Sequence, residues 1–126
     1  MIRYSYVQQL QPPAPFIQIR LQNPVTGDEL HDVPAQLDTA ADRTLIPETL
    51  VQTLALPQLG TLLIGGVGGV QQAMATYPLL LAVHSLPPQT IEVVASPGES
   101  WVLLGRDVLN SYRALLDGPQ LAVEIG

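Results

Sequence analysis

Proline and glycine are spread so densely along this chain that its regular elements must be short. The 126 residues include 12 prolines and 10 glycines, and both residue types interrupt helices. Between them the apolar residues alternate with polar ones, as in 16–22, where Ile17, Ile19 and Leu21 share one face. Such alternation is typical of half-buried strands. The sequence therefore predicts a mostly β fold.

The expected elements follow one another with short turns between them. A turn is expected at 23–28, a polar turn after Leu37, a single helical turn within 47–54 and a hairpin tip at 65–69. The long strand should have an edge or a bulge at Pro78, because proline cannot donate a ladder hydrogen bond. One convincing helix is predicted, at 106–113. Strands are expected at 2–6, 16–22, 29–37, 45–46, 59–64, 70–83, 90–95, 101–104, after 113, and at 120–125.

Length and composition bound the possible functions. A chain of 126 residues forms a single domain, 1–126, and 47% hydrophobic residues are enough for a core. The five cationic side chains are all arginine, against eleven acids, which gives a net charge of -6. Such a surface repels phosphate backbones, so nucleic acid is not an expected partner. The absence of cysteine excludes disulfides, thiol catalysis and cysteine-metal sites.

Apolar runs are too short for a membrane span, since the longest is 78–83. Residues 1–10 have polar and aromatic side chains where a signal peptide has an apolar core. We therefore expect no membrane association and a cytoplasmic location.

Three segments together carry a chemical signal. The first is Asp38-Thr39-Ala40-Ala41-Asp42 after an apolar stretch, the second is the glycine-rich 65–69, and the third is Leu103-Leu104-Gly105-Arg106-Asp107. Each alone is weak, because such pieces are usually turns, hairpin ends or helix starts. Their order and spacing, over about 16–113, resemble the retropepsin-like aspartic proteases. The family's pattern has glycine where this chain has Ala40. Alanine can replace glycine there if the backbone φ is negative, but it is strained if φ is positive.

The resemblance implies a single-lobed acid-protease fold, a closed β-barrel or sandwich with one short C-terminal helix. It implies peptide-bond hydrolysis by a pair of carboxyl groups without a metal or other cofactor, one ionised and one protonated. This chain carries the motif once, so the second carboxyl would come from Asp38 of another copy in a homodimer. The dimer sheet would be built from the two ends of the chain. The N-terminal part is 1–7, followed by a proline-rich connector up to residue 15, and the C-terminal part is 121–125, within C-terminal strands over 114–126.

The resemblance also assigns roles to residues around Asp38. Support of the active-site loop would come from Thr39, Ala40, Ala41, Asp42 and Arg106, with Thr39 reaching the partner's loop and Arg106 forming an ion pair with Asp42. A polypeptide substrate would be held by Arg43, Trp101 and Leu103, together with Gly65, Gly66, Val67, Gly68 and Gly69 of a glycine-rich flap.

Other functions are less well supported by the same residues. His31 and His84 stand on different segments with no partner at metal-ligand spacing, so no metal site is expected. A catalytically silent peptide-binding or dimerisation module of the same fold is the main alternative, motivated by Ala40. A proteolytic domain cut from a larger polypeptide is a third.

Overall fold

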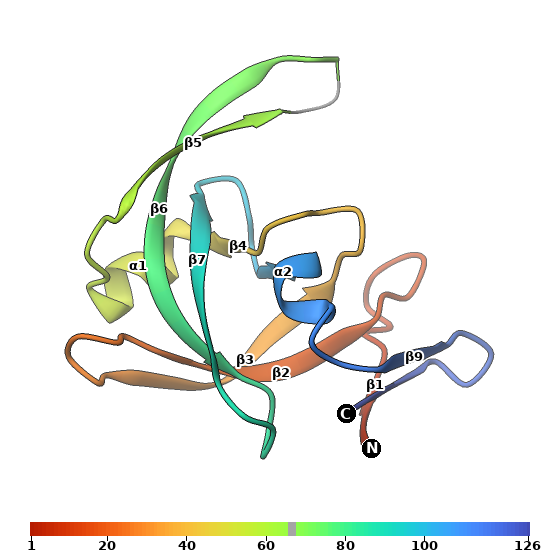
Figure 1. Cartoon of the computed structure of the whole chain (residues 1–126). Coiled ribbons are helices and arrows are strands. Elements are labelled where there is room, and N and C mark those ends of the chain that lie inside the picture. Colours follow the sequence, from red (N-terminus) through yellow and green to blue (C-terminus); the bar gives the residue numbers. More distant parts are fainter. Residues whose placement is uncertain (66–67) are drawn as a thin grey trace.

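The protein is described here by a computed structural model that covers residues 1–65 and 68–126. Its main sheet has the strand order β2-β3-β8-β4-β7-β6-β5, and an additional pairing of β2 with β6 closes six of these strands into a barrel (Figure 1). This confirms the expected all-β, single-domain barrel. The elements are β1 (Ile2–Ser5), β2 (Phe16–Gln22), β3 (Glu29–Leu37), β4 (Leu45–Pro47), α1 (Glu48–Leu54), β5 (Gly60–Gly65), β6 (Gln71–Ala82), β7 (Gln89–Ser96), β8 (Val102–Leu104), α2 (Arg106–Leu109), β9 (Ala114–Asp117) and β10 (Ala122–Ile125).

The barrel is filled by the apolar faces that alternation predicted. Along β2, Ile17, Ile19 and Leu21 are each at most 2% exposed. They pack in one cluster with buried residues of the other barrel strands, including Ala35, Ile46, Leu81, Val93 and Leu104. Burial of such side chains contributes roughly 1.5–3 kcal/mol each, so the barrel is a rigid support for the loops at its rim.

Strand β6 runs through the barrel and beyond it. Its first half pairs with β5 from Gly60 to Gly65, and its last residues pair with β2. Pro78 lies between these two pairings, opposite Glu92 of β7 and with no register shift. The missing N–H of Pro78 therefore falls where the strand is locally an edge, as expected, and no bulge forms there.

Both helices differ in length from the prediction. Helix α1 has seven residues, not a single turn, and Nδ2 of Asn23 caps its end by donating to the carbonyl oxygen of Leu54 at 2.8 Å. Helix α2 was expected over 106–113 but ends at Leu109. The chain leaves the helix because the backbone of Arg113 already pairs with that of Gly126. No helix among the described residues is long and apolar enough to cross a bilayer.

The chain ends form a second, three-stranded sheet in the order β1-β10-β9. The terminal segments expected to build a dimer sheet thus pair with each other within one chain, Ile2 opposite Ile125 and Tyr4 opposite Val123. Ile125 and Val123 are fully buried against the barrel. In Figure 1 the β5–β6 hairpin, the loop after β3 and strand β9 extend toward the same side of the molecule.

Candidate active site

Asp38 stands where two neighbouring strands end. Strands β3 and β8 are parallel, with Leu37 opposite Leu104, so the loop after β3 and the Gly105 turn after β8 emerge at the same edge. The backbone N–H of Asp38 donates to the carbonyl oxygen of Leu104 at 2.9 Å, and that of Arg106 donates to the carbonyl oxygen of Ala41 at 2.9 Å. The first and third sequence segments of the motif thus form one unit with the barrel rim.

The Asp38 side chain is held by its own loop. Its Oδ1 accepts a hydrogen bond from the backbone N–H of Ala40 at 3.1 Å, and its carbonyl oxygen accepts one from Ala41 at 3.2 Å. The residue is only partly buried. This turn fixes the direction of the carboxyl group while one of its oxygens stays available to a ligand.

A hydrogen-bond network behind the loop centres on Thr44, which is fully buried. Its hydroxyl donates to Oδ1 of Asp107 at 2.7 Å and accepts from the N–H of Gly105 at 3.1 Å. Its backbone N–H donates to Oδ2 of Asp107 at 3.0 Å. The Asp107 carboxylate therefore ties the far end of the active-site loop to the start of α2, with charge-assisted hydrogen bonds.

Asp107 is a site residue that the sequence interpretation missed. It belongs to the third sequence segment, but the resemblance assigns it no role. Its position just after Gly-Arg, in the first turn of a helix, was the available signal, because an acid there satisfies free backbone N–H groups. It does so here for Val108, at 2.9 Å.

The ion pair expected between Arg106 and Asp42 is not formed, so that prediction is wrong. Nη1 of Arg106 donates instead to the carbonyl oxygen of Thr39, at 2.7 Å. Among the described residues the ion pairs are Arg3–Glu124 and His31–Glu29. Arg106 still braces the loop, but through the main chain beside Asp38, which its guanidinium reaches from α2.

Alanine fits at position 40 without backbone strain. The non-glycine residues with left-handed φ in the described chain are Asp32, Ala55, His84 and Leu121, and Ala40 is not among them. The Ala40 backbone thus satisfies the condition under which alanine can replace the family's glycine.

A cavity of about 190 Å³ lies between this loop and the β5–β6 hairpin. The loop contributes its backbone turn and two charged residues, and β5 covers it from above. Two larger hollows, of about 370 and 350 Å³, lie between β1 and β2 and contain no residue of the motif. The small cavity is the one that residues of the motif line, next to Asp38 in sequence but not including it. Its lining residues are Ala40, Ala41, Asp42, Arg43, Leu45, Ile64, Gly65 and Val94.

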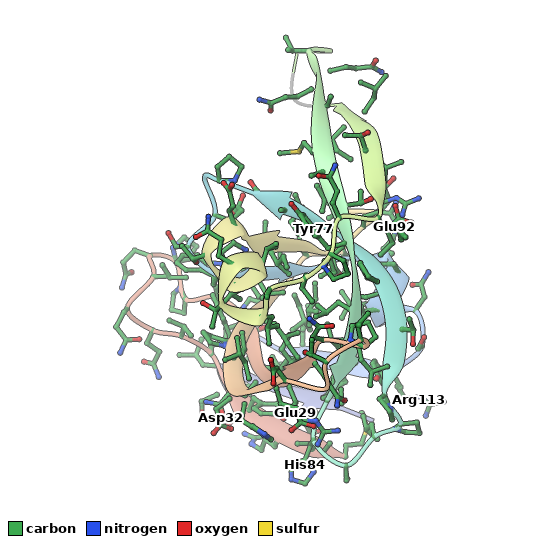
Figure 2. All side chains as sticks on the ribbon, turned by 90° about the vertical axis from the view of Figure 1, so that its left-hand side faces the viewer. Glu29, Asp32, Tyr77, His84, Glu92 and Arg113 are labelled. Carbon is green, nitrogen blue, oxygen red and sulfur yellow. The ribbon has the colours of Figure 1, made fainter. Side chains whose placement is uncertain are left out.

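The outer end of the β5–β6 hairpin is rich in glycine. Gly65 pairs with Gln71 at the end of the arms, and Gly68 and Gly69 have φ values of 88° and 77°, which favour glycine. Gly66 and Val67 lie outside the described residues. Figure 2 shows Tyr77 and Glu92 near the base of the hairpin, where it leaves the barrel.

Trp101 and Leu103, predicted to line substrate pockets, do not line this cavity. The Trp101 ring packs edge-on against Phe16, with centroids 5.4 Å apart, and its Nε1 donates to Oε1 of Gln36 at 2.9 Å. Leu103 is partly exposed and lies opposite Leu45. Their contact with substrate remains a prediction.

The described residues contain no group of three or more potential metal ligands from His, Cys, Asp and Glu. Nε2 of His31 lies 2.9 Å from Oε2 of Glu29, and Nδ1 of His84 lies 3.2 Å from Oγ of Ser85. Glu29, Asp32 and His84 are at the end of the molecule opposite the hairpin (Figure 2). The site itself contains the carboxyl groups of Asp38 and Asp42, which are chemically able to transfer protons.

Solved structures with this fold come from viruses, bacteria and eukaryotes. A retropepsin-like aspartic protease from Rickettsia conorii is similar over 97% of this chain and 86% of its own, with a TM-score of 0.65 and 12% identity. The EIAV protease in complex with the inhibitor HBY-793 is similar over 78% and 86%, with a TM-score of 0.60 and 19% identity. The retroviral protease-like domain of Ddi1 from Leishmania major is similar over 88% of each chain, with a TM-score of 0.52 and 12% identity.

The sequence comparison with curated proteins finds no match. The family comparison does, because the model described as retroviral aspartyl protease matches residues 11–117. That range includes the Asp38 loop, the glycine-rich hairpin and the Gly105 turn, and most of the chain. This protein belongs to the retroviral aspartyl protease family.

Proposed function

We propose that this protein is a homodimeric aspartic endopeptidase in which Asp38 of each chain supplies one half of a catalytic pair. The observation that carries the proposal is the placement of Asp38. Its carboxyl group is held at the barrel rim and is partly exposed, and the loop residues that follow it line a cavity together with strand β5. The family membership supports an aspartic protease.

The chemistry needs two carboxyl groups in contact. Like charges at that distance cannot both ionise, so the pair holds one proton over a range of acidic to neutral pH. The ionised carboxylate removes a proton from water, which attacks the peptide carbonyl, while the protonated group hydrogen-bonds to the carbonyl oxygen. Because the two chains are identical, the roles exchange by symmetry.

A twofold partner fits the side of the molecule where the relevant elements lie. The hairpin, the loop after β3 and strand β9 extend toward that side (Figure 1). Thr39 is exposed there, and its carbonyl oxygen is held by Arg106. In the proposed dimer its hydroxyl contacts the partner's loop and keeps the two carboxyl groups in register.

The substrate is a polypeptide in extended conformation between the loops and the hairpins. Backbone groups of the glycine-rich tip and of Ala40, Asp42 and Arg43 hydrogen-bond to it, and the closed hairpins exclude water. Apolar Leu45, Ile64 and Val94 line the cavity with Arg43 and Asp42 at its polar part, so it accepts a side chain of mixed character.

A second candidate is a silent peptide-binding module of the same fold. The Ala40 methyl group favours it, because this exposed side chain lines the cavity beside Asp38 and narrows the path of a substrate. Such a module would bind peptide or a statine-type inhibitor without cleaving peptide bonds at any pH.

The Asp38→Asn variant separates the two candidates. Cleavage of casein and of a peptide library should be measured for wild type and variant across about pH 3–8, the range in which a carboxyl pair holds one proton. We expect wild-type cleavage that falls at least about 10²–10⁴-fold in the variant, with an unchanged circular dichroism spectrum. Asp28→Asn, in an exposed turn, is the matched control. Undiminished cleavage by Asp38→Asn contradicts the enzyme proposal, and no cleavage by wild type at any pH supports the silent module.

A further inference from the structure

The edge strand of the terminal sheet carries two adjacent leucines that are about half exposed. Leu115 is 51% exposed and Leu116 is 48% exposed. Leu116 lies opposite Val123 of β10, which is completely buried. Strand β9 pairs with β10 on one side, is the outermost strand of its sheet, and projects beyond the barrel (Figure 1). Uncovered, apolar edge strands are association sites.

The hydrogen bonds to β10 show which backbone groups of β9 are left over. Arg113 and Gly126 exchange both backbone hydrogen bonds, at 2.9 and 3.0 Å. In an antiparallel ladder such pairs alternate with pairs that exchange none. Leu115 therefore bonds to Glu124 of β10, whereas the N–H and C=O groups of Ala114 and Leu116 point to the open edge.

In this fold the terminal strands of two copies cannot interleave at β10. Strand β1 already occupies one side of β10, and β9 occupies the other. Strand β9 extends toward the same side of the molecule as the active-site loop and the hairpin (Figure 1).

We propose that β9 pairs antiparallel with β9 of a second copy, so that two three-stranded sheets join into one sheet across the twofold axis. This rests on the proposed homodimer and specifies how it forms. The open groups of Ala114 bond to those of the partner's Leu116, and reciprocally. The axis then passes between Leu115 and the partner's Leu115, which face each other as a pair without hydrogen bonds.

Charge complementarity selects this register. It places Arg113 opposite the partner's Asp117, on the same sheet face as the paired leucines, and the symmetry repeats the contact. Hydrogen bonding through Ala114 and Leu116 also permits two other registers of the strand pair, in which the twofold axis passes through position 114 or position 116. Those registers place Arg113 opposite the partner's Leu115, or Leu115 opposite the partner's Asp117, and lose the charge pairing.

The proposed register predicts which single-cysteine variants form a disulfide between two copies. The chain has no cysteine of its own, so any such disulfide comes from the introduced residue. In Leu115→Cys the two Cα atoms lie roughly 4.5 Å apart, within disulfide range. In Leu116→Cys they lie about 8 Å apart along the diagonal, which is too far. Val25→Cys, in a turn outside the terminal sheet and 76% exposed, controls for random collisions.

The experiment is mild oxidation of the three purified variants, followed by non-reducing electrophoresis. We expect a covalent dimer for Leu115→Cys in at least about tenfold excess over the other two. Equal cross-linking at 116, or none at 115, overturns the proposal.

A charge-reversal pair tests the contact and separates this inference from the proposed function. Arg113→Asp should shift the dimer–monomer midpoint to higher concentration, and Arg113→Asp with Asp117→Arg should restore it, as measured by analytical ultracentrifugation. If Arg113→Asp remains as dimeric and as active as wild type, the β9 interface is wrong while the proposed function stands. If Leu115→Cys cross-links but no Asp38-dependent cleavage occurs, the interface stands and the enzyme proposal fails.

Discussion

A Cβ atom on Gly105 would lie 2.6 Å from the carbonyl carbon of Arg43 and 2.7 Å from its carbonyl oxygen. The turn after β8 therefore packs directly on the main chain of the active-site loop, at a separation that only glycine allows. Because the contact is with backbone, no flexible side chain can move aside to admit a methyl group. The position of the loop, and of Asp38 within it, depends on this contact.

Gly105→Ala should displace the loop. We expect a loss of about 1–3 kcal/mol in the free energy of unfolding, typical of overpacking, and about 10²-fold lower peptidase activity from a displacement near 1 Å. Urea unfolding and a peptide assay measure the two effects. Gly98→Ala is the control, because a Cβ there meets nothing within 4 Å. Equal behaviour of the two variants would contradict the close-packing argument.

Asp107→Asn should weaken the brace behind the loop. The amide cannot accept hydrogen bonds at both of its polar atoms, so one of the N–H or O–H donors of Thr44 loses its acceptor. The expected cost is about 1.5–3 kcal/mol of unfolding free energy. A double-mutant cycle with Thr44→Val should show coupling between the two positions, and purely additive losses would rule out the shared network.

Arg43→Glu should change which peptides are cut. The opposite charges of Arg43 and Asp42 line the same cavity, so wild type should cut peptides with glutamate or lysine near the scissile bond about equally well. Arg43→Glu leaves two acidic residues there and should shift the preference toward lysine by several-fold, since a partly exposed pair contributes about 0.2–1 kcal/mol. The ratio of kcat/KM for matched peptides measures it. Arg20→Glu, which lines a different hollow, should leave the ratio unchanged, and an equal effect there would point to overall charge.

Tyr4 should make the terminal sheet sensitive to alkali. Burial, and then the nearby Asp32 carboxylate, raise the pKa of Tyr4. A raised pKa favours the neutral phenol in the folded state. The free energy of unfolding should thus be unaffected by Tyr4 below the ordinary tyrosine pKa, near 10, and fall as pH rises through the higher folded value. Tyr4→Phe should lose this part of the alkaline decline in thermal melts, and an identical decline would remove Tyr4 as its cause.

The strands of the barrel could be predicted because one local pattern determines them. The ranges 16–22 and 29–37 coincide with β2 and β3, since alternation ends at the 23–28 turn on one side and at the polar Asp38 loop on the other. The family, too, was predicted correctly, from the order and spacing of three short segments. The fold brings the first and third of them to one barrel rim.

Contacts between distant residues were not predictable in the same way. Helix α2 ends early because Arg113 pairs with Gly126, a long-range contact that no local propensity reveals. Arg106 reaches the carbonyl oxygen of Thr39 and not Asp42, which depends on side-chain geometry. The order β1-β10-β9 decides that the termini pair within one chain, and the sequence left that arrangement open.

The central claim is that two chains must each contribute Asp38 to one site, and mixing subunits tests it most directly. A fixed amount of wild type is mixed with increasing Asp38→Asn, at concentrations where dimers form and with time for exchange. If mixed dimers are inactive, random pairing predicts that total activity falls to about half with one equivalent of variant and to about a quarter with three. Activity that stays constant while the variant is added would show that each chain acts alone, and would contradict the account.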